Sequence, residues 1–158
     1  DPAAVQQARE EDVARVRAAY VDMGIAADIA PFFNRLPEIM ADAHLVIGRA
    51  GASTVAELTV IGRPAILVPL PHALDNDQLQ NATRLAESGG AWCIEQKDLS
   101  AERLAAGIEG LLAEPARLAA AAAASKAQGR PDAVRRLASL VEELASMKTM
   151  TAANVKGN

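Results

Sequence analysis

The stretch HLVIGRAGASTVAELTVIGRPAILVP (residues 44–69) decides the predicted fold. Two continuous apolar runs, HLVIG and PAILVPL, flank a segment with helical apolar spacing that stops at Gly62 and Pro64. Strands without polar alternation are typical of parallel sheets that are covered on both faces. The stretch therefore predicts a strand–helix–strand unit and an α/β fold, with a Rossmann-like parallel sheet and flanking helices.

The remainder of the chain continues this alternation. Ser100 is expected to be the N-cap of one helix, and proline opens each of the last two helices, at Pro115 and Pro131. From Lys148 the periodicity ends, so we expect one domain over residues 1–147 and a flexible tail over 148–158. The other expected strands are 28–33 and 91–95, and the other expected helices are 10–23, 36–43, 53–61, 76–88 and 100–113.

Composition limits the class of protein. The chain has 158 residues, half of them apolar, and a net charge of −4. Residues 1–114 carry 9 basic and 17 acidic side chains, whereas residues 115–158 carry 7 and 3. An acidic body disfavours nucleic acid as a partner, because such binding needs dense neutralisation of phosphates. The basic C-terminal part is interpreted as the solvated face of a helix, with contact to an anionic surface as the alternative.

Location and redox state follow from what the sequence lacks. It has no apolar run long enough to span a membrane and no signal peptide pattern, so a soluble, cytoplasmic chain is expected. The single cysteine, Cys93, excludes an internal disulfide and is interpreted as a small buried apolar residue.

The turn after the first apolar run has the chemistry of an anion site. Small residues leave the backbone uncovered, Ser53 and Thr54 add hydroxyls at a helix start, and the helix dipole favours phosphate there. Glu57 lies on the same helix face one turn later, where a carboxylate can accept hydrogen bonds from ribose hydroxyls. The alternative is close helix–sheet packing with Glu57 in solvent. Neither the standard dinucleotide motif nor a P-loop motif is present.

The second loop, PLPHALDNDQLQNA (residues 69–82), should open onto the same edge of the sheet. Asp75 is expected to be a helix N-cap with Gln78 three residues later, which explains the acidic pattern better than a metal site does. Gln78 can then donate to and accept from a sugar hydroxyl. His72 is expected to stabilise the loop rather than act as a general base, and His44 to be structural.

These loops resemble the MurG family of glycosyltransferases, which move N-acetylglucosamine from UDP-N-acetylglucosamine onto lipid I to give lipid II. The blocks ADAHLVIGRAGASTVAEL, GRPAILVPLPHALDNDQLQNA and GGAWCIEQKDLSAERLAAGI carry the likeness, which extends from about Val16 to Leu144. The resemblance implies the C-terminal, donor-binding half of a GT-B fold without its first strand and glycine-rich loop. It also implies an inverting, metal-independent transferase with no cofactor, whose catalytic base and lipid I acceptor site lie in the other half.

The resemblance also implies which residues bind the donor. Residues 52–54 would meet the diphosphate, Glu57 the ribose, Gln78 the sugar ring, and the main chain of Phe33 the uracil. Asp77 stands where the family usually has histidine or glutamine, and Ser53 where leucine is frequent. The implied binding residues are Phe33, Ala52, Ser53, Thr54, Val55, Ala56, Glu57 and Gln78, with Arg49, Gly51, Asp77 and Asn81 as further candidates.

The function expected from this resemblance is donor binding for lipid II synthesis, by a chain that is inactive alone. The full enzyme would be cytoplasmic or peripheral on the cytoplasmic face of the bacterial inner membrane. Two alternatives stay open: another UDP-sugar transferase or epimerase of the same fold, and a non-catalytic sugar-nucleotide binding module.

Overall fold

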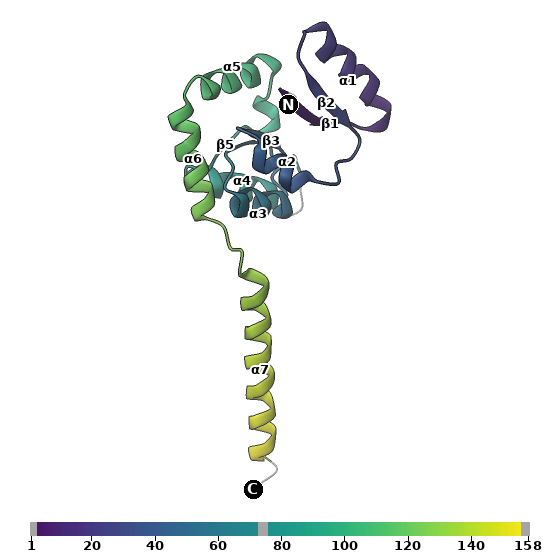
Figure 1. Cartoon of the computed structure of the whole chain (residues 1–158). Helices are drawn as coiled ribbons and strands as arrows, with labels where there is room; N and C mark the ends of the chain where they lie inside the picture. The colour runs from purple at the N-terminus through teal and green to yellow at the C-terminus, as the bar shows by residue number, and fades with distance from the viewer. Residues whose placement is uncertain (1–2, 73–75, 156–158) are drawn as a thin grey trace.

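The computed structural model describes residues 3–72 and 76–155, and it confirms the predicted α/β class (Figure 1). Strands and helices alternate along most of the chain, as the apolar runs indicate. The elements are β1 (Ala4–Gln7), α1 (Glu10–Asp22), β2 (Ala27–Ala30), α2 (Leu36–Asp42), β3 (Val46–Gly48), α3 (Ala52–Ile61), β4 (Ala65–Leu67), α4 (Asp77–Glu87), β5 (Ala91–Cys93), the 3-10 turn η2 (Gln96–Asp98), α5 (Ala101–Leu112), α6 (Pro115–Ala127) and α7 (Ala133–Val155).

The strands form two parallel sheets rather than one. β1 pairs with β2, and β3, β4 and β5 form a second sheet in that order. Figure 1 shows the β1–α1–β2 unit to one side of the larger sheet. In the larger sheet Gly48 lies opposite Leu67, which lies opposite Cys93, so the three strands end at one level.

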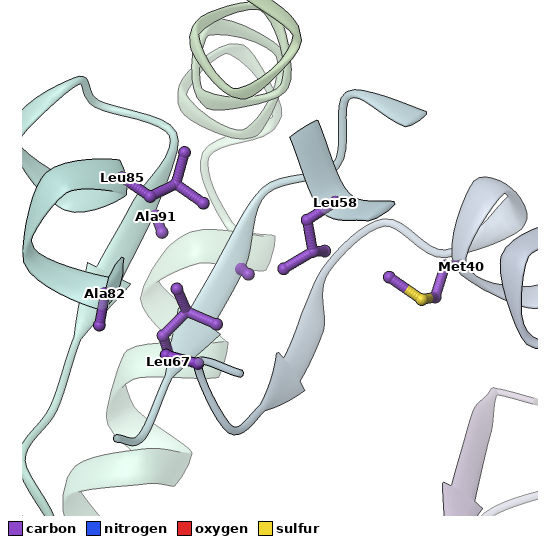
Figure 2. Packing of buried hydrophobic residues seen from close by; sticks show 8 residues of the cluster. Met40, Leu58, Leu67, Ala82, Leu85 and Ala91 are labelled. Carbon is purple, nitrogen blue, oxygen red and sulfur yellow. The ribbon is translucent and has the colours of Figure 1, made fainter. Parts of the chain in front are cut away.

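The central strand of the larger sheet, β4, is buried on both faces. Leu67 and Ala65 of β4 belong to one core cluster, with α2, α3 and α4, whereas Ile66 between them belongs to another, with α5 and α6. This explains why β4 has a continuous apolar sequence. Figure 2 shows part of the first cluster, which consists of Met40, Ala50, Leu58, Ala65, Leu67, Ala82, Leu85 and Ala91.

α6 closes the structure by packing closely on α3 and on the turn before β5. The buried Ser125 hydroxyl donates to the Leu58 carbonyl at 3.3 Å. At Gly90 the backbone of this helix comes so close that a Cβ would lie 2.9 Å from the Ser125 Cα. A glycine is therefore required at that position by packing.

At the ends of the chain the structure differs from the sequence prediction in three features. β1 was not predicted, since AVQQ has a single large apolar residue and becomes a strand by pairing with β2. α7 begins at Ala133, so Pro131 precedes it instead of opening it. The same helix continues past Met147 to Val155, where the sequence predicted no regular structure.

α7 extends away from the rest of the molecule (Figure 1). Between Val134 and Leu144 its large apolar side chains are exposed, from 83% at Val134 to 51% at Leu140. None of the described helices combines the length and apolar character that a membrane span needs.

Candidate donor-binding site

The two predicted loops meet at one edge of the larger sheet, where its parallel strands end. The Val68 N–H donates to the Gly48 carbonyl at 2.9 Å, and the Ile94 N–H to the Leu67 carbonyl at 2.9 Å. α3 begins directly after the turn that follows β3, and the loop that starts at Pro69 leaves the same edge. Ligands of open α/β sheets bind at this edge, where helices point their N-termini.

The N-terminus of α3 is open. Gly51 is its N-cap, and no side chain of the described residues caps the helix. The first N–H to find an acceptor at this end is that of Val55, which donates to the Gly51 carbonyl at 3.0 Å. The N–H groups of residues 52–54 precede it and lack intrahelical acceptors. A Cβ at Gly51 would meet nothing within 4 Å, so an anion can approach these groups.

Glu57, which the sequence predicts as a ribose contact, lies on α3. It lies one helical turn after the exposed Ser53, and its side chain is half-buried, whereas the next residue, Leu58, is fully buried. Within the described part of the chain the Glu57 carboxylate makes no hydrogen bond or ion pair. A half-buried carboxylate in this state can accept hydrogen bonds from vicinal hydroxyls.

Side-chain hydrogen bonds connect the turn after β3 to the loop after β4. Arg49 Nη1 donates to the carbonyls of Val68, at 3.2 Å, and Pro69, at 3.3 Å. The Leu70 N–H donates to Gln78 Oε1 at 3.0 Å. These hydrogen bonds connect the turn after β3, the loop after β4 and the first turn of α4. Sequence reasoning missed Val68, Pro69 and Leu70, because they take part through backbone atoms that no residue type reveals.

A further bond ties α4 to the turn after β3. Asn81 Nδ2 donates to the Ala50 carbonyl at 3.1 Å, although the two residues lie 31 positions apart in the sequence. Asn81 is half-buried and Ala50 is fully buried, so this contact lies beneath the open turn.

The other predicted residues have less definite roles. Val55 is half-buried and Ala56 is exposed on α3. Phe33 is half-buried on the segment between β2 and α2. Asp77 accepts from the backbone N–H of Gln78 at 2.7 Å, which orders the first turn of α4.

The predicted cap of α4 is corrected. The N-cap is Asn76, with a left-handed backbone (φ 53°) and no side-chain cap, and α4 begins at Asp77. Asp75, the residue assigned to this position from the sequence, lies outside the described residues. His72 is exposed with φ 58°, a turn conformation. Among the described residues, no three acidic, histidine or cysteine side chains are close enough to hold a metal ion.

Hollows elsewhere in the molecule do not include these residues. One of about 640 Å³ lies between α1 and the start of β2, beside Arg17 and Tyr20. Another of about 180 Å³ lies between the sheet and α5, beside Trp92 and Gly107.

Known proteins resemble this chain in both sequence and structure. A curated sequence from Brucella canis, named UDP-N-acetylglucosamine–N-acetylmuramyl-(pentapeptide) pyrophosphoryl-undecaprenol N-acetylglucosamine transferase, is 58% identical over 92% of this chain. Relatives of the same name from Brucella suis biovar 1 and Brucella melitensis are 57% identical. The chain spans 38% of the length of these relatives.

Solved structures show the same likeness. The crystal structure of Acinetobacter baumannii MurG matches 90% of this chain and 42% of its own, with a TM-score of 0.81 and 29% identity. The glycosyltransferase VinC in complex with dTDP matches 77% of this chain and 28% of its own, with a TM-score of 0.62 and 26% identity. The model of the glycosyltransferase family 28 C-terminal domain matches residues 3–137, and the chain therefore belongs to this family.

Proposed function

We propose that this chain binds UDP-N-acetylglucosamine at the carboxyl edge of its larger sheet and is the donor-binding part of a transferase that makes lipid II from lipid I. The observation that carries the proposal is the open N-terminus of α3, followed one turn later by the half-buried Glu57 carboxylate. The names of the most similar Brucella relatives support the choice of donor and acceptor.

Each part of the donor has a matching group at this edge. The N–H groups of residues 52–54 face the diphosphate, Glu57 accepts from the ribose hydroxyls, and Gln78 contacts the sugar. The main chain of Phe33 would read uracil. As the acceptor hydroxyl displaces uridine diphosphate from the anomeric carbon, the helix dipole and these N–H groups stabilise the charge on the leaving diphosphate.

The chain supplies donor binding and not the whole reaction. We assign the catalytic base and the site for lipid I to the part of the relatives that this chain does not match. The isolated chain should therefore bind the donor without turnover. Because the proposed acceptor is linked to a lipid, we infer that the complete enzyme contacts the membrane peripherally, at its cytoplasmic face.

We also propose that residues 1–147 form one Rossmann-like domain, with residues 148–158 as a tail, and that its first strand is supplied from elsewhere. In the described chain β1 pairs only with β2, and β3 only with β4, so each has a free edge. One additional parallel strand between these edges would join the two sheets.

Calorimetric titration of the chain tests the function. We expect UDP and UDP-N-acetylglucosamine to bind, UDP-glucose to bind more weakly, and turnover to appear once the remaining part of the enzyme and lipid I are added. Equal affinity for UDP-glucose would indicate a different UDP-sugar enzyme. Binding without turnover in the completed system would indicate a sugar-nucleotide binding module, and absence of UDP binding would reject the site.

A further inference from the structure

Arg49 connects the ends of two neighbouring strands. It follows Gly48, the last residue of β3, and its guanidinium reaches the two carbonyls just beyond the end of β4, those of Val68 and Pro69. A guanidinium presents several N–H donors in a rigid plane, so it can hold two adjacent carbonyls at once. The start of the second loop is therefore fixed relative to the turn before α3.

A second hydrogen bond connects the same loop segment to Gln78. Leu70 follows Pro69 directly, and its N–H donates to Gln78 Oε1. The segment of residues 68–70 is thus held by Arg49 on one side and by Gln78 on the other. Since Gln78 Oε1 is already engaged, the amide is oriented by this contact, and its Nε2 remains to donate to a ligand.

Asn81 provides a tie of a different kind. Its side chain donates to the Ala50 carbonyl in the turn between β3 and α3. Among the described hydrogen bonds, none joins Asn81 to residues 68–70. Loss of Asn81 should disturb the turn itself, whereas loss of Arg49 should disturb the loop that orients Gln78. A variant at Asn81 is therefore a matched control for a variant at Arg49.

We infer that Arg49 is a positioning residue that sets the sugar-contacting loop through the carbonyls of Val68 and Pro69, so that it governs recognition of the sugar more than of the diphosphate. This inference rests on the proposed function, because it needs a nucleotide sugar at the α3 edge. The competing interpretation is direct attraction between the Arg49 charge and the diphosphate. That interpretation predicts equal losses for UDP and UDP-N-acetylglucosamine, and losses that grow as salt is lowered.

The test is titration of the full chain and its variants with UDP and with UDP-N-acetylglucosamine, at two salt concentrations. For Arg49→Gln we expect the UDP-N-acetylglucosamine dissociation constant to rise by roughly five- to tenfold, the value of about one hydrogen bond, with the UDP constant changed less than about twofold. Arg49→Lys, which keeps the charge but replaces the planar guanidinium with a single ammonium nitrogen, should lie between. Asn81→Ala should weaken both ligands by the same factor.

The ratio of the two dissociation constants is the decisive quantity, because a variant that is partly unfolded weakens both ligands equally. An unchanged ratio for Arg49→Gln and Arg49→Lys would overturn the positioning role, whether both affinities fall together or neither changes. If the unsubstituted chain binds no UDP, the proposed function itself fails, and the inference fails with it. Arg49→Lys carries the test if Arg49→Gln does not fold, as judged by circular dichroism.

Discussion

Gln78 Oε1 accepts the backbone N–H of Leu70 at 3.0 Å, so the amide that is predicted to contact the sugar is also a support for its own loop. This contact orients the amide and leaves Nε2 available to donate to the ligand. This relationship determines what each substitution at Gln78 should do.

Gln78→Ala should weaken UDP-N-acetylglucosamine and spare UDP, because the proposed diphosphate and ribose contacts lie on α3. Gln78→Glu is the sharper variant: a carboxylate can still accept from Leu70 but cannot donate to the sugar. We expect the same loss of sugar affinity from Gln78→Glu as from Gln78→Ala, measured by calorimetry. Equal weakening of both ligands would count against a sugar contact.

Glu57→Ala should lower UDP affinity by roughly 2 to 3 kcal/mol, since two hydrogen bonds from ribose hydroxyls to a charged acceptor would be lost. Glu57→Gln, which keeps the shape but not the charge, should lose less. The control is 2′,3′-dideoxy UDP, which lacks the hydroxyls and should bind the original chain and Glu57→Ala alike. Unchanged UDP affinity in Glu57→Ala would reject the ribose role.

Two glycines should respond to alanine in opposite directions. At Gly90 a Cβ would lie 2.8 Å from Leu85 Cδ1 and 2.9 Å from Ser125 Cα, so Gly90→Ala should lower the free energy of unfolding by about 1 to 3 kcal/mol. At Gly110, inside α5, a Cβ would meet nothing within 4 Å, so Gly110→Ala should raise it by about 0.5 to 1 kcal/mol. Urea denaturation compares the two, and a stable Gly90→Ala would show that α6 can move away.

Cys93 should react slowly with alkylating reagents near pH 8. Burial, and then the nearby Glu95 charge, raise the pKa of this thiol, and the thiolate is the reactive form. Glu95→Gln should bring the pKa down and speed alkylation. The pKa of the Cys93 thiol is higher in the folded chain than in the unfolded chain, so the folded chain holds this proton more tightly. The contribution of the protonated thiol to folding stability is therefore fully present below the ordinary thiol pKa, and it is lost as pH rises through the raised value. A pH profile of the alkylation rate, compared with that of the chain in urea, measures the shift.

Regular elements with local signals were predictable from the sequence. The predicted cap at Ser100 is confirmed, because its hydroxyl accepts from the Arg103 N–H at 3.1 Å. The prediction that β4 is buried on both faces is also confirmed, because all three of its residues are buried. The cap forms within three residues of Ser100, whereas β4 is covered by distant helices and only its apolar composition is a local signal.

Features that depend on distant partners were not predictable. β1 exists because Ala4–Gln7 pairs with Ala27–Ala30, and its own sequence has little strand character. The cap of α4 depends on a left-handed Asn76 rather than on a side-chain hydrogen bond. At the site, the hydroxyls and Glu57 were predicted from residue type, but the ties from Arg49 and Asn81 to backbone carbonyls needed coordinates.

α7 forms no substantial packing with any other described element, so its unfolding releases little buried apolar surface. Most of the stability of helices in proteins comes from tertiary packing, which the described part of α7 lacks. Its amide protons should therefore exchange with solvent at rates set by local fraying. Amides of β4 should exchange only when the whole sheet opens, so that two separate time scales of protection divide the chain near Gly129.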